Sequence, residues 1–523
     1  MINGLNNYWN GLARSTQAWS IIACLTLFRL VYIAFAPVTS QEVYYWLYSN
    51  HPALAYVDHP PMIAYSIILG TSLFGDNGFG IKFMAVIWSL LTNVFLYWTV
   101  IRGLSRTSGE DAENVGILAV LLYNLTLFAH AFAIIQQPDA ALLFFWLLVI
   151  FFVQEYQMTG RPANLLFAGI ALGLGLLCKY TALALLPGIL IVLLLTSEGR
   201  RSLFSPYPWL ALIFAGLVFS PVIYWNWNHE WASFQMQFED RGGEIAAQRS
   251  VQFRYFFQLL GTQLAMLTPL VFVLLVRFYH RMTTGWREYP KAHLYFLSGV
   301  CLIAGFILIS FTTKVKVHWL LPGYIGVVLG IVVVFRSSLS FRSPWIMRGT
   351  WFSMGLIGLC HGLFLVPGFQ IFQVNSWSGW RDLTTQVVLL QERLGGQDQV
   401  FLFADSHKTA AYLTFYSPDH QRSYAQNIFG QFAKQFNVWG EPESLQGKNA
   451  LYVTSVPDLS AGETGLLGKY FDQVTRIAKF SYPLISVGDE PTRDVYCYFG
   501  TNYHLAPRSG SQEADSGEEF KYD

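Results

Sequence analysis

The sequence is poor in charged residues and in cysteine. Asp, Glu, Lys and Arg make up only 12% of its 523 residues, about half the share usual in a soluble domain. So little charge excludes a disordered chain, a coiled coil and a nucleic-acid binder with a basic face. The five cysteines form no C-x-x-C pair, and four of them lie in apolar runs. The sequence therefore predicts neither a disulfide framework nor a zinc site.

Three further motifs are missing from the sequence: an internal repeat, an H-E-x-x-H metal motif and a glycine-rich phosphate loop. Transporters often contain internal repeats, so the absence of a repeat counts against a transporter or flippase of an amphiphilic glycolipid. We keep this class of protein as the alternative to a membrane enzyme. No metal ligands are predicted, although a divalent metal held by His59, His229 and His318 stays open.

Long apolar runs fill most of the chain, and AVILMFWYC residues account for 53% of it. The runs are about 16–22 residues long, enough or nearly enough to cross a bilayer core. We predict a polytopic α-helical membrane protein with about 11–13 spans. The runs are 18–36, 80–101, 115–133, 139–154, 163–178, 180–196, 207–226, 256–278, 293–312, 317–335 and 347–367. Arg29 lies inside the first run, and we expect it to be structural and paired with a carboxylate.

Charge is distributed unevenly along the chain. The part from Asn375 onward has 18 acidic and 12 basic residues, whereas the part before it has 14 acidic and 21 basic residues. This shift predicts a membrane domain followed by one water-soluble domain. The expected parts are a transmembrane domain over 1–374 with extracytoplasmic loops 37–79 and 227–255, a small α/β domain over 375–506, and a disordered tail over 507–523.

Lys and Arg in the short loops predict the orientation in the membrane. With the N-terminus in the cytoplasm, thirteen of these residues lie on the cytoplasmic side and seven on the other, as the positive-inside rule requires. An odd number of spans then places the C-terminal domain outside the cytoplasm. We expect a multi-pass protein of the bacterial inner membrane.

The C-terminal domain contains both helical and strand patterns. Apolar spacing predicts a helix over Trp380–Leu394 and a short helix over Thr409–Phe415. Short apolar runs predict strands at Val400–Phe403, Leu451–Thr454 and Val495–Phe499. These elements indicate a small α/β fold.

Glu42 is the first candidate for chemistry. It closely follows the first predicted span and is surrounded by aromatic residues, among them Tyr45. A carboxylate at the membrane surface loses part of its hydration, which should raise the pKa of Glu42 and suit a general base. The alternative is an ordinary solvated Glu within an aromatic belt at the interface.

Asp139 is the second candidate carboxylate. It follows Pro138 and opens an apolar run, which fits an N-terminal helix position stabilised by the helix dipole. A capping residue at the membrane surface can also face a site, so both roles stay open.

Cationic residues on the predicted outer side form a third group of candidates. Lys179, Lys314 and Lys316 interrupt closely spaced apolar runs, and Arg241 lies in a long outer loop. Ionisable residues in such places are costly and are therefore functional candidates. Their charge suits the phosphate of a lipid-linked substrate. The alternative is snorkelling or the binding of bulk anionic lipid.

Several short motifs occur along the chain in a characteristic order. They are Gln41-Glu42-Val43-Tyr44-Tyr45-Trp46, Asp58-His59-Pro60-Pro61, Phe74-Gly75-Asp76, Pro138-Asp139-Ala140, Lys179-Tyr180-Thr181, Pro221-Val222-Ile223-Tyr224-Trp225-Asn226, His318-Trp319-Leu320 and Gly379-Trp380-Arg381. Together they resemble the motifs of the C-superfamily of membrane glycosyltransferases, in the bacterial branch related to protein O-mannosyltransferases. That branch includes the aminoarabinose and galacturonic acid transferases of lipid A.

The resemblance implies a sugar-transfer reaction. The donor would be a polyprenyl-phosphate-linked monosaccharide. The acceptor would be lipid A, a glycolipid, a polysaccharide or a protein at the outer face of the inner membrane. Direct displacement would invert the anomeric centre, and we expect the enzyme to be a monomer that binds no nucleic acid.

The resemblance also implies roles for individual residues. The family has Asp-Glu where this chain has Gln41-Glu42, so Glu42 or Asp139 would take the catalytic role, unless an anionic acceptor needs no base. Lys179, Lys314, Lys316 and Arg241 would bind the donor phosphate. The residues expected to contact the substrates are Tyr45, Asp58, His59 and His318.

Overall fold

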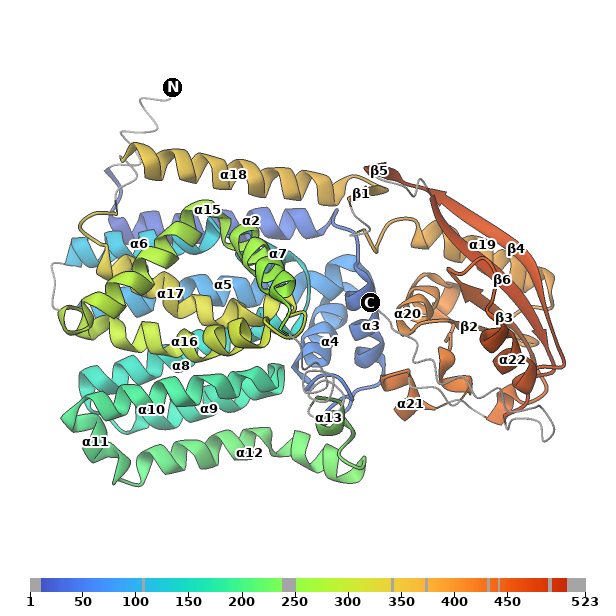
Figure 1. Ribbon diagram of the computed structural model, residues 1–523, viewed down its shortest axis with the longest axis horizontal. Coiled ribbons are helices and arrows are strands. Elements are labelled where there is room, and N and C mark those ends of the chain that lie inside the picture. Colours follow the sequence, from blue (N-terminus) through green and yellow to red (C-terminus); the bar gives the residue numbers. More distant parts are fainter. Residues whose placement is uncertain are drawn as a thin grey trace. The chain divides into compact units, whose positions relative to one another are not determined.

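The chain forms two compact units in the computed structural model (Figure 1). The first consists of Met1–Ala36 and Ser49–Gly362, and the second of Pro37–Tyr48 and Leu363–Asp523. The second unit thus begins before Asn375 and also takes in a short segment from the start of the chain. The structure describes residues 11–105, 109–237, 251–339, 343–371, 375–429, 433–440, 443–487 and 492–505.

The first unit is built from helices that run along one another, as Figure 1 shows. They are α2 (Arg14–Ile33), α4 (Met62–Phe74), α5 (Gly78–Gly103), α6 (Gly109–Asn124), α7 (Leu127–Ile134), α8 (Pro138–Thr159), α9 (Ala163–Cys178), α10 (Leu185–Leu195), α11 (Ser197–Leu203), α12 (Tyr207–Asn228), α13 (Ala232–Gln235), α15 (Phe253–Thr284), α16 (His293–Ile309), α17 (Leu321–Val334) and α18 (Pro344–Leu365). The α18 helix begins in the first unit and ends in the second.

Seven helices of the described residues are long and apolar enough to cross a membrane, or up to nine if two bent pairs each form one span. The polytopic α-helical fold is thus as expected, but fewer helices meet this test than there are apolar runs. One reason is bending: the chain turns by 75° between α6 and α7 and by 119° between α10 and α11. A second reason is length, because α9 has only 16 residues.

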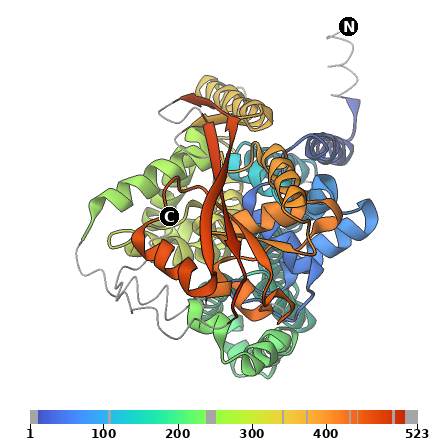
Figure 2. The same cartoon turned by 90° about the vertical axis from the view of Figure 1, so that its right-hand side faces the viewer.

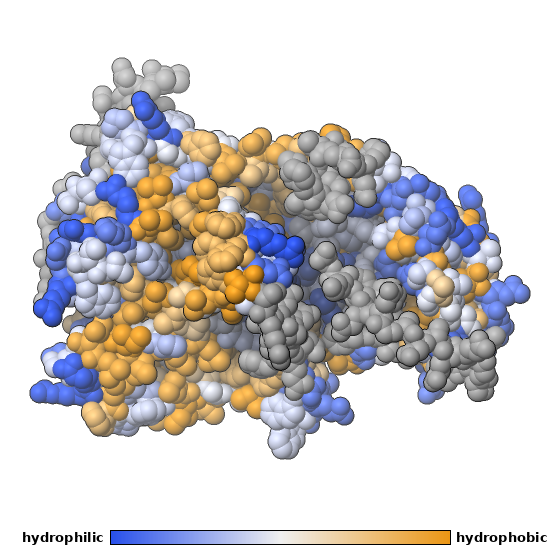
Figure 3. Space-filling view, viewed as in Figure 1, coloured by the Kyte–Doolittle hydropathy of each residue, from blue (hydrophilic) through white to orange (hydrophobic). Residues whose placement is uncertain are grey.

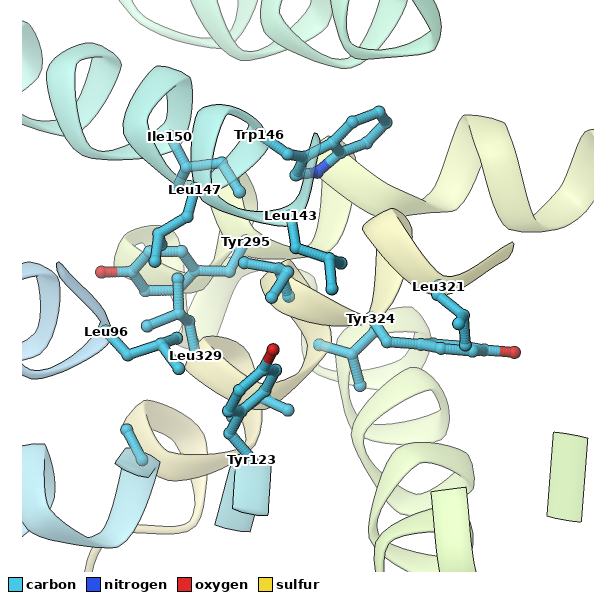
Figure 4. Close-up of a cluster of buried hydrophobic side chains, with 14 of the residues drawn as sticks. Leu96, Tyr123, Leu143, Trp146, Leu147, Ile150, Tyr295, Leu321, Tyr324 and Leu329 are labelled. Carbon is cyan, nitrogen blue, oxygen red and sulfur yellow. The ribbon is translucent and has the colours of Figure 1, made fainter. Parts of the chain in front are cut away.

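The centre of the first unit is formed by α8 and α17. In the most apolar stretch of each helix, 67% of the residues are buried in α8 and 78% in α17 with the turn before it. The corresponding stretch of α12 is only 22% buried. A helix that is apolar all round is expected inside a bundle, whereas the exposed apolar side chains of an outer helix face lipid. Figure 4 shows Leu147 of α8 and Leu329 of α17 in one cluster with Tyr123 and Tyr295. The surface over the outer helices is largely hydrophobic (Figure 3).

Arg29 of α2 is buried in a polar network between helices. Its guanidinium donates to Ser89 Oγ at 2.9 Å and to Asn124 Oδ1 at 2.6 Å, and Asn124 donates in turn to Asn93 Oδ1 at 2.6 Å. The expected carboxylate partner is therefore wrong: in the described part of the chain, neutral hydroxyl and amide groups hold this cation. Such bonds lower the cost of a charge at membrane depth.

The second unit contains a four-stranded sheet with the order β2-β3-β6-β4. Its strands are β2 (Val400–Ala404), β3 (Asn449–Thr454), β4 (Gln473–Pro483) and β6 (Thr492–Thr501). The β2 and β3 strands are parallel, whereas β6 runs antiparallel to β3 and β4. Its main helices are α19 (Trp380–Arg393), α20 (His407–Tyr416), α21 (Gln435–Trp439) and α22 (Ala461–Tyr470). Figure 2 shows the long last strands in red. A parallel pair, β1 (Phe369–Ile371) and β5 (Ile485–Val487), completes the unit.

The segment Pro37–Tyr48 belongs to the core of the second unit. It includes most of α3 (Ser40–Asn50). The indole of Trp46 is completely buried, with its ring 5.0 Å from that of Phe415 and 4.7 Å from that of His420. The Tyr412 hydroxyl donates to the carbonyl of Val38 at 3.2 Å. The second unit is therefore assembled from two distant parts of the sequence.

Candidate active site

A buried ion pair joins the beginning of α8 to the end of α9. Asp139 lies in the first turn of α8, and Lys179 is the residue that follows α9. The two helices pack against each other and are joined by a three-residue loop, so these ends lie at the same membrane face. The Lys179 ammonium lies 2.9 Å from Oδ1 and 3.1 Å from Oδ2 of Asp139, and Asp139 is only 2% exposed. The helix dipole of α8 further favours the carboxylate.

Two histidines lie near this ion pair. His59 and His318 are close enough to Asp139 to interact with its carboxylate electrostatically. His318 lies in a 3-10 turn (Val317–Leu320) just before α17, and His59 lies in the loop before α4. Four of the residues expected at the site, from four chain segments, thus come together in the first unit. Among the described residues no group of three or more His, Cys, Asp or Glu could hold a metal ion.

Asp58 and Tyr180 border the same region. Asp58 is 3% exposed, and its backbone carbonyl accepts a hydrogen bond from Gln237 Nε2 at 3.0 Å. The Asp58 carboxylate is close enough to the Tyr180 phenol to interact with it electrostatically. The Tyr180 hydroxyl is hydrogen-bonded to Ser233 Oγ at 2.7 Å. Sequence reasoning missed Ser233, because a lone serine in a polar loop carries no distinguishing pattern.

The motif around Trp225 has a structural role at the end of α12. Trp225 and Val222 pack against Ala55 and Val57 and so fix the loop that leads to Asp58. The side chain of Asn226 accepts a hydrogen bond from the Ser233 backbone amide at 3.1 Å. These contacts hold the loops that carry Asp58 and Tyr180 against α12.

The remaining cationic candidates differ in exposure. Lys314 and Lys316 are both exposed, in the loop that leads from α16 to His318. Lys82, a further cation, lies in α5 and is completely buried. Arg241 lies outside the described residues. The structure thus brings Lys179 to Asp139 and leaves Lys314 and Lys316 on a nearby stretch of surface.

Glu42 belongs to the second unit and takes part in a capping box. Its Oε2 accepts hydrogen bonds from the backbone amide and the hydroxyl of Thr39, both at 2.9 Å, and its own amide donates to Thr39 Oγ1 at 3.4 Å. This reciprocal pattern starts a helix, here α3. Glu42 is completely buried and is not the ordinary solvated residue of the alternative interpretation. Tyr45 is 5% exposed on the same helix.

The fold is that of a membrane protein of known structure. ArnT from Cupriavidus metallidurans, in a crystal structure bound to undecaprenyl phosphate, has a TM-score of 0.56 and 14% sequence identity, over 94% of this chain and 99% of that chain. Its apo structure also has a TM-score of 0.56, over 93% and 98% of the two chains. The chain is a multi-pass membrane protein, and it has the fold of ArnT.

Comparisons of the sequence with known proteins give one family and two curated relatives. The family model described as dolichyl-phosphate-mannose-protein mannosyltransferase matches residues 58–225, which include Asp58, His59, Asp139 and Lys179. A lipid A galacturonosyltransferase, RgtD of Rhizobium johnstonii, is 25% identical over 327 residues, 60% of this chain and 65% of that protein. An undecaprenyl phosphate-alpha-4-amino-4-deoxy-L-arabinose arabinosyl transferase of Edwardsiella ictaluri is 28% identical over 226 residues, 41% of this chain and 39% of that protein.

Over residues 58–225 the chain thus resembles the family described as dolichyl-phosphate-mannose-protein mannosyltransferase, and over nearly its whole length it has the fold of ArnT. Its matches span less than two thirds of the length of either curated relative.

Proposed function

We propose that the protein transfers a monosaccharide from a polyprenyl-phosphate-linked donor to a cell-envelope acceptor. The observation that carries the proposal is the buried Asp139–Lys179 pair at one membrane face, with His59 and His318 beside it. The names of the two curated relatives, both sugar transferases, support the same reaction class. The acceptor would be lipid A, another glycolipid, a polysaccharide or a protein.

The ion pair is suited to hold a phosphate leaving group. An ammonium has three N–H donors, and Lys179 uses two directions toward the oxygens of Asp139. The third can reach a donor phosphate without loss of the pair. Lys314 and Lys316, exposed on the loop before His318, would add positive charge as the bond between the anomeric carbon and the phosphate oxygen breaks.

A carboxylate would accept the proton of the acceptor hydroxyl as its oxygen attacks the anomeric carbon. Glu42 is our first choice, because both oxygens of Asp139 are bonded to Lys179. Asp139 is the second choice. Attack opposite the leaving phosphate inverts the anomeric configuration. Tyr45, Asp58, His59 and His318 would contact the sugar or the acceptor.

We also propose that the protein lies in the bacterial inner membrane with its second unit outside the cytoplasm. The excess of Lys and Arg in the loops assigned to the cytoplasmic side supports this orientation. The acceptor would then be modified at the outer face of the membrane.

Transfer of label tests the reaction. The full chain in lipid nanodiscs would receive undecaprenyl-phosphate-linked galacturonic acid or aminoarabinose, labelled in the sugar, together with lipid A. We expect label in the acceptor and a loss of transfer in Lys179→Met. If no envelope acceptor gains label while labelled donor crosses the bilayer of a vesicle, the protein is a flippase and the proposal is wrong.

A further inference from the structure

An apolar groove lies on the side of the first unit, between α8, α9, α10, α11 and α12. Its volume is about 430 Å³, and the residues that line it are apolar. Leu190, Leu212 and Trp209 on its walls are 48%, 42% and 58% exposed. Figure 3 shows the hydrophobic surface over α10 and α12. In a membrane protein such a groove is filled by hydrocarbon rather than by water.

The groove reaches a membrane face where arginines gather. Arg161 lies in the loop between α8 and α9, and Leu165 of the next helix lines the groove. Arg200 and Arg201 lie on α11, whose Leu203 also lines the groove. All three arginines are exposed. Because α8 begins and α9 ends at the Asp139–Lys179 pair, this face is opposite to the candidate active site.

The bend of 119° between α10 and α11 turns α11 away from the direction of the spans. Exposed aromatic residues follow directly: Phe204 is 94% exposed, and the indole of Trp209 donates to the carbonyl of Leu203 at 3.0 Å. Aromatic residues of this kind mark the level of the lipid headgroups. The arginines of α11 are therefore at headgroup level, on the same short helix as Leu203 of the groove wall.

Charge indicates the kind of lipid. Glu198 is the acidic residue of α11, and its carboxylate interacts with Arg200 and Arg201. Three arginines and one glutamate leave a net charge of +2, which attracts an anionic headgroup more strongly than a zwitterionic one. Guanidinium groups also fit the oxygens of a phosphate with paired hydrogen bonds.

We propose that the groove binds one acyl chain of an anionic phospholipid, with its phosphate against Arg161, Arg200 and Arg201. At roughly 30 Å³ per atom, the share of one water in the liquid, the groove has room for on the order of fourteen chain carbons, close to one fatty-acyl chain. The site is separate from sugar transfer, because it lies at the other membrane face.

Native mass spectrometry of the full chain, titrated with dioleoyl phosphatidylglycerol or dioleoyl phosphatidylcholine, tests the site. We expect tighter binding of phosphatidylglycerol, and a loss of about fivefold for each arginine removed in Arg200→Gln and Arg201→Gln. Leu190→Trp, which narrows the groove and leaves the charge unchanged, should weaken both lipids. The matched control is Arg348→Gln, an exposed arginine on α18 outside the groove, and it should bind as the parent protein does.

Three comparisons can overturn the proposal. If Leu190→Trp leaves binding unchanged, or if Arg348→Gln weakens it as much as Arg200→Gln does, the lipid is held by surface charge and the groove is not its site. Dihexanoyl phosphatidylglycerol and inorganic phosphate serve as probes without a long chain, and equal affinity for them would also contradict it. Unchanged thermal melting of each variant shows that folding is not the cause.

Discussion

At the scale of single residues, the pairing of Asp139 with Lys179 makes each dependent on the other. Breaking a buried ion pair leaves one uncompensated charge, which typically costs about 3–5 kcal/mol, whereas replacing both partners costs far less. The pair therefore has a structural effect besides any role in transfer, and the two effects must be measured separately.

The first prediction follows from this dependence. Asp139→Asn leaves the Lys179 ammonium, 12% exposed in the parent protein, without its partner, and we expect about 3 kcal/mol of destabilisation. Adding Lys179→Met should restore part of this loss, while sugar transfer stays absent in both variants. Thermal melting in detergent and the transfer assay are the two measurements. Additive losses of stability in the double variant would contradict the coupling.

The second prediction separates the two possible roles of Glu42. Thr39→Val removes the hydroxyl that bonds Oε2 but keeps the carboxylate, so it should cost about 1 kcal/mol of stability and preserve transfer. Glu42→Gln can still form a capping box but cannot accept a proton. It should keep its stability and lose transfer by about 100-fold or more. Full transfer in Glu42→Gln would move the proton-accepting role to Asp139 or show that no base is needed.

At the scale of elements, apolar patterning predicted most of the fold. The strands β2, β3 and β6 and the helices α19 and α20 lie where the sequence placed them, because each has a run of buried side chains. The edge strand β4 and the helix α22 were missed. Most β4 residues are exposed or only partly buried, and α22 contains three glycines, which weaken a helical pattern.

The candidate site shows the limit of sequence reasoning in a similar way. Asp139 and Lys179 were both recognised, because ionisable residues beside apolar runs are costly. Their pairing depends on the antiparallel packing of α8 and α9, so Lys179 was assigned to the donor phosphate alone. The bend between α10 and α11 was also missed, because its angle depends on packing against α12 and α16 rather than on a local motif.

The third prediction concerns Asp405, which links β2 to α20. Its Oδ2 accepts hydrogen bonds from Thr454 Oγ1 at 2.8 Å and from the Ser455 amide at 3.2 Å, yet burial raises the pKa of its carboxyl. The folded protein therefore holds this proton more tightly than the unfolded chain does. The stability it contributes is complete below the unfolded pKa of about 3.9 and is lost as pH rises through the folded value.

Asp405→Asn should thus stabilise the second unit at pH 7, by on the order of 1 kcal/mol. The gain should shrink as the pH falls, because the raised pKa lets the parent carboxyl take up its proton more readily in the folded protein. Hydrogen exchange of the β2 and β3 amides in the full chain measures the difference. A gain that does not change with pH would show that the desolvated charge is not its cause.

At the scale of the whole molecule, the fourth prediction concerns orientation. A reporter that is active only outside the cytoplasm should be active when it is fused after Tyr503, because the Lys and Arg distribution predicts that the second unit lies outside. The matched control is the same reporter inserted beside Arg161, where it should be inactive. A reporter that is inactive after Tyr503 but active beside Arg161 would reverse the proposed topology.

The path of the chain through the second unit has a consequence for biosynthesis. Pro37–Tyr48 leaves the ribosome early, whereas its partners begin at Leu363, roughly 300 residues later. At 5–20 residues per second the delay is on the order of 15–60 s. Throughout this interval the aromatic side chains of Tyr44 and Trp46 have no finished core to enter. The membrane interface can shelter them meanwhile, so insertion of the spans must precede completion of the sheet.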